Sequence, residues 1–451
     1  MHALLLLGLL ASPRVVAELS AAQVVAVGDR LVALEPDLLH LRGLDRDGKP
    51  RWRKRFQAEA RGIQALFVHD GRVLLYAGEQ ARWVDAATGE RGPAIPVPYL
   101  SSPGHPGCWL NHVGGAYAFY CPCEFRFAQA DGAPLGEPYR FHQRCERDYD
   151  GNGSSCGCWG SSGDLIGRAG DLALARVEEP PTPAERHEKR SHYGDLLVAV
   201  SVKTGQEVWR QPAPLGQAAT YIGGLGVLPD GRTFFNADAA GRITAHDAAT
   251  GGLLWRDPPA DADGERPHQP GSRVVVVPPD GLFFFANGQA TLFDARSGQV
   301  RWRHALPDAR LALPATATEP LGVQGPGPIH LLRPADGQPA AVLTLTAEAG
   351  HLLPVGDRVI VRDGSTLRLH APDGTLIGRA TGVGSAAPVL VNGLVAQAGP
   401  DGMAFFDPAT LAPLGAVAGD DATVEPAPGP RRVLVVARKG NRIKLIEVAQ
   451  P

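Results

Sequence analysis

One phrase recurs along the chain and limits what the chain can fold into. Its fullest copy runs from Arg242 to Arg256, where an alternating segment enters an Ala-Ala-Thr-Gly turn and a second segment leaves with Trp255, four positions after Gly251. The same glycine-to-tryptophan offset occurs in three further copies: Gly48 and Trp52, Gly205 and Trp209, Gly298 and Trp302. Alternating segments on either side of such a turn predict two antiparallel strands.

Weaker copies keep the turn but lose the tryptophan, and the spacing of all nine turns predicts the architecture. The turns fall at positions 48, 89, 132, 205, 251, 298, 337, 374 and 411. All but one of the gaps are close to forty residues, a period typical of four-stranded propeller blades repeated around an axis. The exception is the gap of 73 residues between Gly132 and Gly205.

Composition agrees with an all-β chain. Many short segments are separated by 55 Gly and 40 Pro, and we find no long stretch with helical periodicity. One complete blade can be read from Arg273 to His304, with strands at 274–277, 282–286, 289–294 and 299–304. A last hairpin at 432–438 and 442–448 has no following turn. We expect it to pair with the N-terminal strand and close the ring, which leaves no open sheet edge.

The phrases Asp-Ala-Ala-Thr-Gly-Gly-Leu-Leu-Trp and Ser-Val-Lys-Thr-Gly-Gln-Glu-Val-Trp resemble the repeat of the PQQ-binding-like β-propellers. The resemblance implies an eight-bladed ring, with seven or nine blades as alternatives. It also implies that the tryptophan of one blade docks into a neighbouring blade, a role that falls here on Trp52, Trp209, Trp255 and Trp302. It is specific for the fold and much less so for function, because this fold carries both dehydrogenases and scaffolds without catalytic activity.

No catalytic or PQQ-binding residue of the quinoprotein dehydrogenases can be carried over to this chain. Those enzymes hold PQQ beside a disulfide between adjacent cysteines, and no two cysteines are adjacent here. We therefore expect no catalytic residue and no bound PQQ, and a quinoprotein-type oxidoreductase remains the alternative function.

The first seventeen residues resemble a secretory signal peptide. Leu4 to Leu10 form an apolar run too short to span a bilayer, and Val15 and Ala17 suit positions −3 and −1 of a cleavage site. We expect cleavage after Ala17, a propeller over 18–451, no membrane span, and a periplasmic or secreted protein.

All six cysteines lie between residues 101 and 194: Cys108, Cys121, Cys123, Cys145, Cys156 and Cys158. One repeat is lengthened in this region, and we expect a Cys-rich insertion at about 141–194. An even number of clustered cysteines in an exported chain predicts three disulfides, whose pairing the sequence leaves open. The alternative is a zinc or iron–sulfur site, with nitrogen ligands from His105, His112 or His142.

A second feature of the insertion is Asp148-Tyr149-Asp150-Gly151-Asn152-Gly153. Oxygen donors at Asp148, Asp150 and Asn152, followed by a glycine, match the first half of a calcium loop. The twelfth position is Trp159, which cannot supply the carboxylate that such loops use. A polar turn without metal is the other interpretation, and a metal- or calcium-binding propeller module is a further alternative function.

Charge indicates neither a nucleic-acid nor a membrane partner, since 44 basic and 47 acidic residues are well mixed and the net charge is −3. The sequence therefore predicts a non-catalytic exported scaffold that binds a partner protein in the cell envelope. In outline this resembles the propeller component of the bacterial outer-membrane protein assembly machinery, although the cysteine that anchors that lipoprotein has no counterpart here.

Overall fold

The computed structural model describes residues 13–449 apart from 57–62, 97–108, 141–163, 178–195, 213–224, 258–272, 314–320, 346–350 and shorter stretches between strands. Every regular element within the described residues is a β-strand. No helix in this part of the chain has the length and apolar character needed to cross a bilayer. The prediction of an all-β fold is confirmed.

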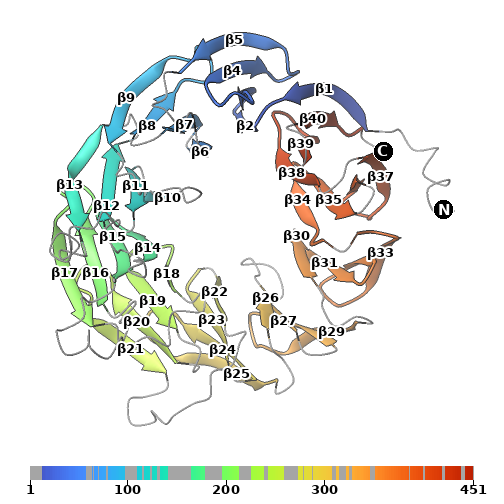
Figure 1. The fold of residues 1–451 in the computed structure, drawn as a ribbon. Coiled ribbons are helices and arrows are strands. Elements are labelled where there is room, and N and C mark those ends of the chain that lie inside the picture. The colour runs from blue at the N-terminus through green and yellow to red at the C-terminus, as the bar shows by residue number, and fades with distance from the viewer. Residues whose placement is uncertain are drawn as a thin grey trace, which may run out of the picture.

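The strands form four-stranded antiparallel sheets that follow one another around a ring (Figure 1). In every sheet but the last the strands run in chain order, so that the first lies at the inner edge of the ring and the fourth at the outer edge. We call each sheet a blade.

The blades of the first half of the chain are β2 (Gln23–Val27), β3 (Arg30–Leu34), β4 (His40–Asp45) and β5 (Pro50–Arg55); β6 (Ala65–His69), β7 (Arg72–Ala77), β8 (Gln80–Val84) and β9 (Arg91–Pro96); β10 (Trp109–Val113), β11 (Ala116–Cys121), β12 (Glu124–Gln129) and β13 (Pro134–Arg140); β14 (Asp164–Ala169), β15 (Leu172–Val177), β16 (Leu196–Ser201) and β17 (Glu207–Pro212); and β18 (Leu225–Val227), β19 (Thr233–Ala237), β20 (Ile243–Asp247) and β21 (Leu253–Asp257).

The blades of the second half are β22 (Arg273–Val277), β23 (Gly281–Ala286), β24 (Gln289–Asp294) and β25 (Val300–Ala305); β26 (Leu311–Leu313), β27 (Leu321–Gln324), β28 (Pro328–Leu332) and β29 (Pro339–Thr344); β30 (His351–Val355), β31 (Arg358–Asp363), β32 (Thr366–His370) and β33 (Leu376–Thr381); β34 (Val389–Val391), β35 (Leu394–Gly399), β36 (Gly402–Phe406) and β37 (Pro413–Ala418); and β38 (Ala422–Pro426), β39 (Arg432–Ala437) and β40 (Arg442–Glu447), joined by β1 (Arg14–Ser20).

The described residues thus form ten four-stranded sheets, which corrects the expectation of eight blades and also excludes the seven or nine that were left open. Each of the nine turns recognised in the sequence joins the third and fourth strands of one blade. The C-terminal strands and β1 make the tenth. Counting turns therefore gave the right number of blades for the body of the chain, whereas the resemblance suggested a smaller ring.

The two ends of the chain close the ring together. Strand β1 pairs antiparallel with β40, from Arg14 opposite Glu447 to Ser20 opposite Arg442, and so forms the outer strand of the last blade (Figure 1). The prediction that the last hairpin joins an N-terminal strand is confirmed. Ala17, after which we expect the leader to be cleaved, lies within β1 opposite Leu445.

Apolar clusters between neighbouring blades form the core. One joins Phe235 and Ile243 to Phe284 and Phe293 of the next blade, and another joins Leu19 and Leu434 to Leu31 and Leu44 at the ring closure. Because each blade is covered on both faces, middle strands such as β23 are buried along their whole length, whereas outer strands such as β17 are largely exposed. This packing fixes the positions of the turns that build the candidate sites.

The expected insertion falls at two places in the topology. Residues 141–163 lie between β13 and β14, and residues 178–195 lie between β15 and β16 of one blade. Both segments are outside the described residues. The strands that flank the second segment are those expected from the sequence, at 172–177 and 196–201.

Candidate functional site

The recurring turn uses its carboxylate to hold its own backbone. In the blade with the fullest copy, Asp247 Oδ1 accepts hydrogen bonds from the backbone N–H and the hydroxyl of Thr250, at 2.9 and 2.8 Å. The Gly251 N–H donates to the Asp247 carbonyl, with Gly251 at φ +74°. Asp85, Asp294 and Asp407 cap their turns in the same way. The repeated aspartates are therefore turn caps, a use for which Asp is well suited.

Each tryptophan of the phrase contacts the turn of the following blade. The indole N–H groups of Trp52, Trp209, Trp255 and Trp302 donate to the carbonyls of Ala86, Ala248, Ala295 and Pro334, at 2.9–3.1 Å. The rings lie on the turn glycines, so that a Cβ on Gly298 would meet the Trp255 ring at 2.5 Å and one on Gly251 would meet Trp209 at 2.7 Å. Tryptophan and glycine are thus two halves of one contact between blades.

In four of the five copies without the tryptophan, a glycine or an alanine takes its place: Gly136, Ala341, Gly378 and Gly415. Gly136 lies directly against the backbone of Thr204 in the next turn, and Glu137 N–H donates to the Thr204 carbonyl at 3.1 Å. Ala341 occupies the same position against Gly374. The weaker copies of the phrase therefore mark blades whose backbones approach each other without an intervening ring.

The histidine of the fullest copy, His246, is packed and hydrogen-bonded within its own blade. His246 is 2% exposed and stacks on Phe234, with ring centroids 4.9 Å apart. Its Nδ1–H donates to the Gly251 carbonyl at 3.1 Å, and its Nε2 lies 3.0 Å from Thr244 Oγ1. Burial lowers the pKa of His246, because the charged imidazolium would lose its hydration.

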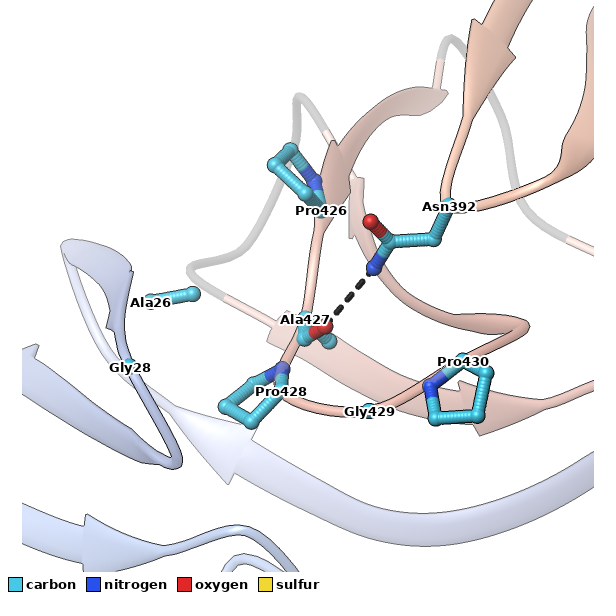
Figure 2. A pocket seen from close by; sticks show the side chains of 8 residues that line it. All are labelled: Ala26, Gly28, Asn392, Pro426, Ala427, Pro428, Gly429 and Pro430. Carbon is cyan, nitrogen blue, oxygen red and sulfur yellow. Dashed lines mark hydrogen bonds between the residues drawn. The ribbon is translucent and has the colours of Figure 1, made fainter.

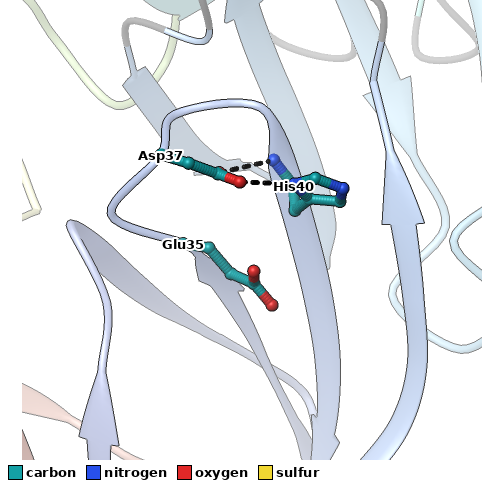
Figure 3. A group of neighbouring side chains, drawn as sticks. All are labelled: Glu35, Asp37 and His40. Atoms are coloured by element: carbon teal, nitrogen blue, oxygen red, sulfur yellow. Dashed lines mark hydrogen bonds and ion pairs between the residues drawn. The ribbon is translucent and has the colours of Figure 1, made fainter.

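A group of possible metal ligands lies at the turn between β3 and β4 (Figure 3). One ligand atom each of Glu35, Asp37 and His40 lies within 4.8 Å of the others. His40 Nδ1 is 2.5 Å from Asp37 Oδ2, and Asp37 Oδ1 accepts from the Leu39 N–H, which lowers the pKa of Asp37.

The third member of this group is already paired. Arg53 binds the Glu35 carboxylate through Nε and Nη2 at 2.9 and 2.7 Å, and this hydrogen-bonded pair lowers the pKa of Glu35. Figure 3 shows that the interactions within the group join Asp37 to His40 and leave Glu35 apart. The arrangement is that of a capped turn beside a bidentate ion pair, which explains these side chains without a metal.

A pocket of about 490 Å³ opens where the ring closes (Figure 2). Three turns of the same type contribute to it, each joining the first and second strands of a blade: β2 to β3, β34 to β35, and β38 to β39. The lining residues are Ala26, Gly28, Asn392, Pro426, Ala427, Pro428, Gly429 and Pro430. None of them is an acid, a base or a nucleophile.

Asn392 fixes the shape of this pocket. Asn392 and Gly393 have φ of +46° and +72°, as a tight two-residue hairpin turn requires, and Asn is one of the few residues that tolerates this conformation. Its Nδ2 donates to the carbonyls of Ala427 and Arg432, both at 2.7 Å. The Arg431 N–H donates in return to the Asn392 carbonyl at 3.1 Å. The proline-rich turn is thereby tied to the neighbouring blade.

The sequence did not single out this pocket. Its signals are the run Pro426-Ala427-Pro428-Gly429-Pro430 and the Asn392-Gly393 pair, which lie apart in the chain and meet only when the ring closes. The expected calcium ligands Asp148, Asp150 and Asn152 lie outside the described residues, as do the side chains of the six cysteines. Disulfides, metal and calcium at the insertion therefore stay predictions.

Comparison with known proteins gives one family match and several similar structures. Residues 193–318 match the family model described as outer membrane protein assembly factor BamB. No curated protein matches. BamB from Moraxella catarrhalis is 13% identical over 96% of this chain and 99% of that chain, with a TM-score of 0.38. The computationally designed Ika8 protein is 13% identical over 87% and 98%, with a TM-score of 0.43. A eukaryotic initiation factor is 11% identical over 82% and 90%, with a TM-score of 0.49.

The family match covers the blades in which the phrase is most complete, from the strand before Gly205 to the strand after Gly298. In these blades the turn glycine and the docked tryptophan occur together, and the turn is capped by Ser201, Asp247 or Asp294. The chain is thus a β-propeller of four-stranded blades, and residues 193–318 match a family of PQQ-like repeats.

Proposed function

We propose that the protein is an exported, non-catalytic scaffold that binds a partner protein in the cell envelope. The observation that supports this most directly is how the described residues use their polar groups. The repeated carboxylates cap turns, Glu35 is paired with Arg53, and the pocket at the ring closure is lined by proline, glycine, alanine and one amide. Such a surface is suited to recognition rather than to acid–base or nucleophilic chemistry.

The architecture favours the same role. Interlocked blades hold many turns in fixed positions around one ring, and a surface that is ordered before binding loses less entropy when a partner docks. The family model that matches residues 193–318 is named for a factor in outer-membrane protein assembly. That name supports an envelope partner, together with the leader-like first seventeen residues.

The test is purification of the full chain, expressed with its first seventeen residues, from the envelope fraction of its native cells. We expect the protein outside the cytoplasm, in a complex of reproducible stoichiometry with a defined partner that reassembles from separately purified components. A chain that stays in the cytoplasm, or that runs only as a monomer in the envelope fraction, would contradict the proposal. So would dye-linked oxidation of an alcohol after incubation with PQQ and calcium.

A further inference from the structure

The pocket at the ring closure combines uncharged walls of proline, alanine and glycine with one side-chain hydrogen-bond acceptor of fixed orientation. Both N–H groups of the Asn392 amide are engaged, by the carbonyls of Ala427 and Arg432. An amide nitrogen has two donors, so the orientation of the Asn392 amide is fixed, and Figure 2 shows its oxygen on the side away from Ala427. Among the described residues no group donates to this oxygen. The pocket therefore presents an acceptor that is held in place and still available.

The walls around this acceptor are rigid and uncharged. Pro426, Pro428 and Pro430 present three pyrrolidine rings from one turn, and proline fixes φ and has no N–H to donate. Ala26 and Gly28 form the facing wall from the first blade. No carboxylate lines the pocket, so a cationic ligand would lose hydration without a counter-charge. The volume of about 490 Å³ is within the range of ~300–1,000 Å³ that small-ligand pockets occupy.

A ligand suited to these walls has an uncharged body that can pack on the proline rings, and one neutral donor for Asn392 Oδ1. The indole of tryptophan has this composition, because its only polar group is an N–H that donates. The chain itself shows the same recognition at four blade contacts, where indole N–H groups donate to turn carbonyls and the rings lie on turn glycines. The pocket offers an amide oxygen in place of the carbonyl, together with Gly28 and Gly429.

We propose that this pocket binds a tryptophan side chain of a partner protein, with the indole N–H donating to Asn392 Oδ1 and the ring lying against the proline-rich turn. The inference rests on the scaffold function proposed above and names the side chain of the partner that the scaffold would bind. Because the pocket walls come from the last two blades and the first, an occupant would also bridge the two ends of the ring.

The direct test uses the full chain, with N-acetyl-L-tryptophanamide as the probe. Binding is followed by saturation-transfer NMR at probe concentrations up to ~10 mM, which detects dissociation constants in the millimolar range. The matched ligand is its 1-methylindole analogue, which has the same ring but no N–H. We expect it to bind about 2–10-fold more weakly, as loss of one hydrogen bond predicts. Equal binding of both compounds, equal binding of N-acetyl-leucinamide, or no binding of the tryptophan probe would each overturn the proposal.

Variants locate the probe on the protein. Asn392→Gly keeps the positive φ but removes the acceptor, and we expect probe binding to fall to the level of the 1-methyl analogue. Since this change also cuts the ties to Ala427 and Arg432, Pro428→Ala serves as a second variant that leaves Asn392 in place. The control is Asp357→Ala in the exposed turn between β30 and β31, which should bind like wild type.

Probe binding that is unchanged in both Asn392→Gly and Pro428→Ala would place the probe elsewhere and sink the proposal. The partner complex separates this result from a failure of the scaffold function. If the complex forms equally well with Asn392→Gly and with Asp357→Ala, the scaffold proposal stands and the tryptophan pocket does not.

Discussion

Arg432 donates to Asp47 across the junction of the last and the first blade, at 2.9 Å, although 385 positions separate the two residues. The same guanidinium reaches the Arg46 carbonyl at 3.0 Å and Glu447 at 3.1 Å. The Arg432 side chain is 9% exposed, whereas Asp47 and Glu447 are 45% and 36% exposed. One arginine thus links the turn of the first blade to the strands that close the ring.

Replacing this arginine should weaken the contact between the last and the first blade and so destabilise the ring. We expect Arg432→Ala to lower the free energy of unfolding by about 1–2 kcal/mol, near the low end for hydrogen bonds to charged groups because both carboxylates remain partly hydrated. Urea unfolding measures the change. Arg46→Ala is the control, since Arg46 contributes only its backbone carbonyl to Arg432 and should change stability by less than about 0.5 kcal/mol. Equal stability of the two variants would show that the link does not hold the ring.

The tryptophan–glycine contact predicts a coupled pair of substitutions. Trp255→Phe should cost about 0.5–1.5 kcal/mol for the lost hydrogen bond to Ala295, in addition to lost packing. Gly298→Ala should cost more than the roughly 1–2 kcal/mol of a left-handed residue, because its Cβ would also meet the Trp255 ring. Combined with Trp255→Ala, the Gly298→Ala change should lose this second contribution. A double-mutant cycle with no coupling between the two positions would rule out the contact as a source of stability.

Burial of His246 predicts a pH dependence of stability. Its pKa in the folded state is lowered from 6.5, so between the two values the unfolded state binds more protons than the folded state. The stability that His246 contributes is therefore complete above pH about 6.5 and is lost as the pH falls through that value toward the folded pKa. The measurement is the free energy of unfolding of wild type and of His246→Gln from pH 7.5 to 5, about the range in which histidine titrates. The difference between the two proteins isolates the contribution of His246. A difference between the two that does not change with pH would exclude it.

Processing of the N-terminus affects the ring directly. Cleavage after Ala17 would remove residues 14–17 of β1 and leave Leu445 to Glu447 of β40 without their partners. We expect a chain that begins at Glu18 to exchange the amides of this part of β40 faster than one that begins at Arg14. Intact mass of the exported protein shows which form exists. Equal exchange in the two forms would mean that the first half of β1 contributes nothing to ring closure.

The six cysteines predict a change of mass on reduction. Reduction under denaturing conditions should increase the intact mass of the exported protein by about six daltons, one hydrogen for each thiol of three disulfides. Metal analysis on the same sample is the companion measurement. Six free thiols together with bound zinc or iron would instead favour a metal site at Cys108, Cys121, Cys123, Cys145, Cys156 and Cys158.

The local structure could be predicted because it depends on short-range chemistry. The four strands expected between Arg273 and His304 match β22 to β25, and each strand end agrees to within one residue. The Asp, Thr and Gly of the phrase form the turn that they indicate, because a carboxylate, a hydroxyl and a positive φ are all that this turn needs. The final hairpin lacks a turn of its own, and this alone showed that it needed a strand from elsewhere.

The closure of ten blades into one ring, and the pocket at that closure, were decided by the tertiary structure. A ring closes at the number of blades whose faces pack well against one another, and the residues between neighbouring turns, a Trp at some junctions and an Ala or a Gly at others, are part of that packing. The repeat period carries no information on the angle between neighbouring blades. Asn392 and Pro428 are likewise unremarkable turn residues in the sequence. They line one pocket only because β1 and β40 pair and bring the last blades against the first.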